Sequence, residues 1–205
     1  MFRPDSWPIR FLTRVCDLML LNLALVLSCA TVVCSGAAVT SLYAVTLKML
    51  RGQGDTPVKD FLQTLRESFL PSFPATLLLF VDLTLLALLC TALFAEELLL
   101  SPALFVLLAI AAVLFTAVLA WLFPLLARFE NTFPKHLANA VKLALARLPV
   151  TCLMTLVDLL PLLLCLLFPA LTGYFAAFWL LIGFAAGAWV NSFYLNRSFE
   201  ALQGG

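Results

Sequence analysis

Long apolar runs alternate with short polar segments along most of this chain. A helix rises about 1.5 Å per residue, so about 20 residues cross a hydrocarbon core of about 30 Å. Most of the runs reach that length, and the one at 36–50 is shorter. The predicted membrane spans are 15–33, 36–50, 71–94, 103–127, 149–168 and 171–195. The pattern therefore predicts an all-α polytopic membrane protein, with a single transmembrane domain over residues 1–205.

Two of the polar segments, 57–70 and 134–147, are amphipathic at the helical period. In the first, Phe61 and Leu65 share one face and Arg66 lies opposite. Helices of this kind lie in the plane of the membrane interface with the apolar face toward lipid. The sequence therefore predicts two amphipathic interfacial helices between the spans, on the cytoplasmic side.

The basic residues decide how the chain is threaded. If 36–50 crosses the membrane, all twelve Lys and Arg fall on one side, and the opposite loops at 34–36, 95–102 and 169–172 contain none. Gly36 suits a tight turn in the first of these loops. The positive-inside rule therefore favours six spans in the cell (plasma) membrane, with both termini in the cytoplasm.

Composition excludes several function classes. The chain is 64% hydrophobic and 11% charged, whereas a soluble domain carries about 25% charged residues. The net charge is +1 and no basic tail points to nucleic acid. The six cysteines lie in apolar segments without a CxxC pair, and there is one histidine. We therefore expect no metal site, no cofactor and no enzymatic activity.

A weak internal duplication relates the two halves of the chain. Pro74 and Asp82 in one half correspond to Pro149 and Asp158 in the other, at a nearly constant offset. Each unit reads span, interfacial helix, span, and is used as spans two–three and again as spans four–five. Since both units run in the same direction, they predict a parallel repeat about an axis along the membrane normal.

Asp82 and Asp158 are the sharpest candidates for function. Each follows its helix-opening proline by about 12–14 Å of helical rise, which places it near the bilayer midplane. An ionised carboxylate there costs about 2.5–3.5 kcal/mol, and no basic residue is predicted at that depth. One interpretation is a proton-titrating or polar-substrate site. The other is a pair of protonated acids that hydrogen-bond neighbouring helices.

Other polar and small residues within the spans carry similar alternatives. Asn22 either faces the same cavity as the acids or bonds a neighbouring helix. Trp179 either stacks on a sugar or packs in the bundle. Gly183 and Gly187 form a GxxxG motif, which allows close helix packing within the chain or between two chains.

A family resemblance rests on a pattern within spans one and two and the polar segment after them. The matching residues are Leu21-Asn22, Gly36-Ala37-Ala38, Thr40, Leu42-Tyr43, Leu47, Arg51-Gly52, Asp60-Phe61 and Phe69. With these residues, the chain resembles the YesL family of bacterial integral membrane proteins over roughly residues 1–70. The remainder matches in hydropathy and length. Thr31 and Cys34-Ser35-Gly36 depart from the family, which tends to have a proline and Thr-Ile-Gly there.

The resemblance implies a link to carbohydrate uptake but assigns no molecular function. The family has no agreed molecular function, but its genes often stand beside carbohydrate-importing ABC systems, which implies saccharide uptake in a Gram-positive bacterium. Asn22 and Tyr43 are the motif-matching candidates inside the membrane. We expect a small transporter or transport-linked binding protein with a midplane polar site, or a non-catalytic accessory or regulatory partner of a sugar ABC importer. The expected partners are the lipid bilayer, importer subunits and a small saccharide.

Overall fold

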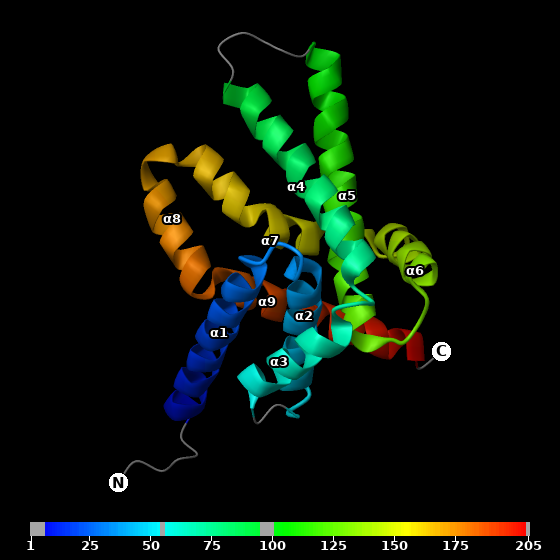
Figure 1. The fold of residues 1–205 in the computed structure, drawn as a ribbon. Helices are drawn as coiled ribbons and strands as arrows, with labels where there is room; N and C mark the ends of the chain where they lie inside the picture. The colour runs from blue at the N-terminus through cyan, green and yellow to red at the C-terminus, as the bar shows by residue number, and fades with distance from the viewer. Residues whose placement is uncertain (1–6, 54–55, 95–100, 204–205) are drawn as a thin grey trace.

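In the computed structural model, residues 7–53, 56–94 and 101–203 are described, and their regular secondary structure is entirely helical (Figure 1). The all-α prediction is confirmed. The elements are α1 (Trp7–Cys29), α2 (Ser35–Leu50), α3 (Pro57–Ser68), α4 (Phe73–Phe94), α5 (Pro102–Arg128), α6 (Phe133–Ala146), α7 (Leu148–Leu167), the 3-10 helix η1 (Pro169–Leu171), α8 (Thr172–Phe178), the π-helix η2 (Trp179–Gly183) and α9 (Phe184–Gln203). The predicted loop at 95–102 falls largely outside the described residues.

Among the described residues, five helical segments are long and apolar enough to cross a membrane. They are Phe11–Cys29, Phe73–Leu93, Pro102–Arg128, Leu148–Leu167 and Pro169–Phe199. Large apolar side chains on them face outward, with Leu27, Leu107 and Leu167 each more than 60% exposed. A soluble protein does not leave so much contiguous apolar surface in water. The chain therefore has the character of a membrane-embedded protein in contact with lipid.

The short helix α2 lies inside the bundle. Thirteen of its sixteen residues are buried, and it packs against α1, α3, α4, α5 and α9. Three of its hydroxyl groups are satisfied inside the helix, because Thr40, Ser41 and Thr46 each donate to the carbonyl four residues earlier. The buried Ser35 hydroxyl has no partner among the described residues. Sixteen residues span only about 24 Å. Length and enclosure both distinguish α2 from the five lipid-facing segments.

The amino end of α2 touches the start of α4, which corrects the expected position of Gly36. A methyl group on Gly36 would overlap Thr76 Oγ1 and lie 3.0 Å from the Ser72 carbonyl oxygen. Nearby, the Thr40 and Ser72 hydroxyls are 3.1 Å apart. The predicted threading put the Gly36 turn and the start of the third span on opposite faces. The two meet because α3 packs back against α2 before α4 begins, and α4 then extends beyond the α1–α2 hairpin (Figure 1).

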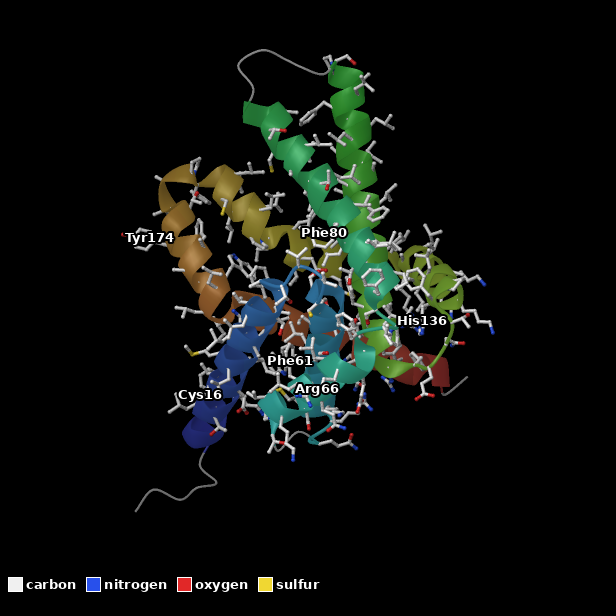
Figure 2. The ribbon with its side chains drawn as sticks, in the orientation of Figure 1. Cys16, Phe61, Arg66, Phe80, His136 and Tyr174 are labelled. Atoms are coloured by element: carbon white, nitrogen blue, oxygen red, sulfur yellow. The ribbon has the colours of Figure 1, made fainter. Side chains whose placement is uncertain are left out.

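The amphipathic helices α3 and α6 each have a side that is buried in the protein. Phe61 of α3 and His136 of α6 are buried (Figure 2), and on α6 the buried residues continue with Ala140 and Ala144. Leu145 is 66% exposed. Each helix therefore packs one edge against the bundle and presents apolar side chains outward.

Candidate functional site

A cavity of about 190 Å³ lies between α2, α4, α5 and α7. Both predicted acids line it, Asp82 from α4 and Asp158 from α7. Tyr43 of α2 and Thr116 of α5 supply the other polar groups. The apolar part of the lining consists of Val39, Leu79, Leu83, Leu86, Leu119, Ala120, Phe123 and Leu159. The fold thus brings together three of the predicted candidates, which come from three different helices.

Asp82 is buried against α5. The Thr116 hydroxyl oxygen is 3.0 Å from Asp82 Oδ1 and 3.2 Å from Oδ2. The same hydroxyl is 3.0 Å from the Ala112 carbonyl oxygen. A hydroxyl has one hydrogen, so Thr116 serves the carboxyl group or the carbonyl at any one moment. Most of the acceptor capacity of Asp82 therefore remains for water or a proton in the cavity.

Asp158 is half-buried and belongs to a chain of polar side chains. Asn191 Nδ2 donates to Asp158 Oδ1 at 2.9 Å and to the Tyr43 hydroxyl oxygen at 3.3 Å. Asn191 is fully buried, and its Oδ1 atom has no hydrogen-bond partner in the described part of the chain. These hydrogen-bonded side chains link α7, α9 and α2. Sequence reasoning missed Asn191, although a lone amide within the last apolar run was a usable signal.

The cavity carries acids without a counter-charge. None of its lining residues is basic. Two ionised carboxylates around so small a space would repel each other, and each would pay the cost of charge in a low-dielectric interior. Within the described residues, no three His, Cys, Asp or Glu side chains converge as metal ligands do. The arrangement is therefore suited to hold water and protons.

Asn22 lies outside this cavity, in a contact between α1 and the π-helix η2. Its Nδ2 donates to the carbonyl oxygens of Trp179 at 3.0 Å and Leu180 at 2.7 Å. Its Oδ1 accepts from the Ala185 amide at 2.9 Å. A π-helix interrupts the i to i−4 ladder, so neighbouring backbone groups need other partners. The fully buried carboxamide of Asn22 supplies these partners. Asn22 is thus a side chain that hydrogen-bonds α1 to the segment around η2.

Trp179 and the two glycines are not among the residues that line the acid cavity. The buried Trp179 ring packs edge-on against Phe178, with centroids 5.6 Å apart. A methyl group on Gly183 would overlap the indole, so this glycine makes room for Trp179. A methyl group on Gly187 would lie 3.4 Å from Val157 of α7. Both glycines therefore make close contacts within the chain.

One family model matches the chain, over residues 18–90, and its description is a protein of unknown function, DUF624. The matched segment runs from within α1 into α4 and overlaps the segment that resembles the YesL family. It contains Asn22, Tyr43 and Asp82, while Asp158 and Asn191 lie beyond it. Neither the curated proteins nor the solved structures contain a match to the chain. The family description therefore assigns no activity.

Proposed function

We propose that this membrane protein takes part in solute uptake, as a small transporter or transport-linked binding protein that exchanges protons at the Asp82–Asp158 cavity. One observation carries the proposal: two acids from different helices line one cavity that has no basic lining residue. Pockets for small organic ligands measure about 300–1,000 Å³. A cavity of about 190 Å³ suits water and protons, and a saccharide would need it to open.

The chemistry of the lining explains why a proton would matter. Protonation removes the charge of a carboxyl group, which lowers the cost of keeping it away from water. A protonated carboxyl also becomes a hydrogen-bond donor. Asp158 bonds to Asn191 of α9 and Asp82 to Thr116 of α5. A change of protonation therefore acts directly on two contacts between helices.

The experiment compares Asp82→Asn and Asp158→Asn with the parent chain in liposomes. Infrared spectra should show a protonated-carboxyl band in the parent that weakens in each variant, and proton-coupled uptake from a panel of monosaccharides and disaccharides should fall to the level of empty liposomes. Asp17→Asn is the matched control, because Asp17 is an acid of α1 outside the cavity lining. Unchanged bands and unchanged uptake in both cavity variants would overturn the proposal.

The threading of the chain is part of the proposal. If α2 is a buried helix that crosses only part of the bilayer, Gly36 can meet the start of α4, and all twelve Lys and Arg would still fall on the cytoplasmic side with both termini. The α2–α3–α4 and α5–α6–α7 units would then be the two copies of the parallel repeat. In a chain without native cysteines, Lys59→Cys and Lys142→Cys should escape an impermeant maleimide on intact cells. Labelling of either residue from outside contradicts this threading.

A second candidate function, the accessory partner of a sugar ABC importer, is favoured by a polar cleft of about 650 Å³ beside α3, α5 and α6. Its lining includes Glu67, Arg128, Glu130 and His136, which suits a polar protein surface. Purification of the tagged chain from its native membranes should then recover importer subunits. Repeated recovery of the chain without any importer subunit would count against this candidate.

A further inference from the structure

A second hollow also borders α7 and differs from the acid cavity in chemistry. It is a groove of about 520 Å³ between α5, α6 and α7. Its lining consists of Val113, Leu114, Ala117, Val118, Val141, Ala144, Leu145, Leu148, Thr151, Cys152, Thr155, Leu156 and Leu159. The Thr151 hydroxyl is already engaged, since it accepts from Trp121 Nε1 at 2.9 Å and lies 2.9 Å from the Ala144 carbonyl oxygen. The groove therefore offers an almost purely apolar surface.

The length of the groove matches one leaflet of a bilayer. Along α7 its lining runs from Leu148 to Leu159, which corresponds to about 16 Å of helical rise. Half of a hydrocarbon core of about 30 Å is about 15 Å. A single acyl chain that starts at the membrane interface near Leu148 would therefore end near Leu159.

A basic residue lies at the end of the groove where a lipid headgroup would lie. Arg147 joins α6 to α7 and falls between two lining residues, Leu145 and Leu148. Among the described residues, the Arg147 guanidinium has no hydrogen-bond or ion-pair partner. Lys142 instead lines a different hollow, together with His136 and Asn139. An unpaired cation beside an apolar groove complements a ligand with an anionic head and an apolar tail.

We infer that this groove binds an anionic phospholipid, with one acyl chain between α5, α6 and α7 and the phosphate beside Arg147. The site is separate from the proton chemistry proposed above and does not depend on it. One residue joins the two, because Leu159 lines both the groove and the acid cavity. The tip of a bound acyl chain would therefore press on a wall of the cavity.

The test measures lipids that remain on the purified full-length chain, by native mass spectrometry in detergent. Phosphatidylglycerol and phosphatidylcholine with identical acyl chains are added separately, and phosphatidylglycerol should bind more tightly. The variant R147Q should lose about fivefold of its affinity for phosphatidylglycerol, because a basic side chain near an anionic headgroup contributes substantially to binding. The matched control is K142Q, which removes a basic residue of α6 that lines a different hollow.

A second pair of variants tests the groove itself. Cys152 lies in the groove and Cys16 lies on α1 (Figure 2), and both are exposed. Cys152→Phe should fill the groove and reduce the retention of both lipids, while Cys16→Phe should leave retention unchanged. Equal binding of the two lipids would overturn the anionic headgroup, and lipid binding that is insensitive to Cys152→Phe would overturn the groove. A dimer that Cys152→Phe converts to monomers would show that a second copy occupies it instead.

Discussion

Asn191 and Asp158 join α9 to α7 at the edge of the acid cavity, with 2.9 Å between Nδ2 of the amide and Oδ1 of the carboxyl group. The same amide nitrogen reaches the hydroxyl of Tyr43 on α2. One fully buried side chain thus connects three helices that lie far apart in the sequence. The polar lining of the cavity depends on this amide for its geometry.

Asn191→Ala should lower the stability of the protein and disturb the cavity. The substitution leaves the Asp158 carboxyl and the Tyr43 hydroxyl without this donor, and a buried polar group that loses its partner costs about 1–3 kcal/mol. We expect a lower thermal unfolding midpoint in detergent. Asn139→Ala on the exposed face of α6 should leave the midpoint almost unchanged, and equal effects of the two variants would contradict the assignment.

Gly36→Ala should destabilise the contact between α2 and α4. The added methyl group would meet the Thr76 backbone nitrogen at 2.9 Å and the Ser72 carbonyl oxygen at 3.0 Å, and backbone atoms cannot move aside cheaply. Overpacking of this kind costs about 1–3 kcal/mol. Thermal unfolding measures the effect.

The control for Gly36 is a helical glycine in open space. Gly173 in α8 has nothing within 4 Å of an added methyl group, and alanine is favoured over glycine within a helix by about 0.5–1 kcal/mol. Gly173→Ala should therefore be neutral or slightly stabilising. If Gly36→Ala behaves in the same way, the two helices do not approach as closely as the structure has them.

Asn22→Asp should loosen the π-helix η2 although the side chain keeps its size. Aspartate can still accept from the Ala185 amide, but when ionised it cannot donate to the Trp179 and Leu180 carbonyl oxygens. Two carbonyls then lose their partner at a cost of about 1–3 kcal/mol each. Hydrogen exchange followed by mass spectrometry should show faster exchange in η2 and the start of α9, with little change in α4. Unchanged exchange in η2 would show that the π-helix is held by other contacts.

His136 should make stability depend on pH. Burial lowers its pKa below the ordinary value of 6.5, and a hydrogen bond with the Asn131 backbone opposes that shift. The unfolded chain therefore takes up a proton at a higher pH than the folded chain, so this contribution is complete above pH 6.5 and declines as the pH falls below it. His136→Gln removes the titrating group. The unfolding midpoint of the parent should fall more steeply from pH 7 to pH 5.5 than that of His136→Gln, and parallel curves would contradict the prediction.

Helix positions could be predicted from the sequence because lipid demands apolar runs of a minimum length. The helices α5 and α7 begin and end within a residue of the predicted 103–127 and 149–168. The convergence of Asp82 and Asp158 on one cavity is in line with their similar predicted depths. The polar partners of the acids were harder to foresee, because Thr116 and Asn191 reach them through tertiary packing that no local pattern encodes.

The largest differences between the prediction and the structure concern short-range departures from ideal helices. The π-helix at Trp179–Gly183 has no distinct residue signature, so the partner of Asn22 could not be foreseen from the sequence. Hydropathy alone cannot tell a lipid-facing helix from an enclosed one. The run at 36–50 was predicted as a short span on the distribution of charge, and its enclosure by other helices was not predicted. Its small residues Gly36, Ala37 and Ala38 were the available sign of close packing.

The enclosure of α2 has a consequence for biosynthesis. The ribosome makes this helix second, yet much of the surface around it belongs to α5 and α9, which are synthesised far later. Thr46, for example, meets Ser192, a residue 146 positions further along the chain. Until α9 has been synthesised, the surface of α2 that will contact it faces lipid or the insertion machinery. Chains that stop before α9 should therefore be the preferred substrates of membrane proteases.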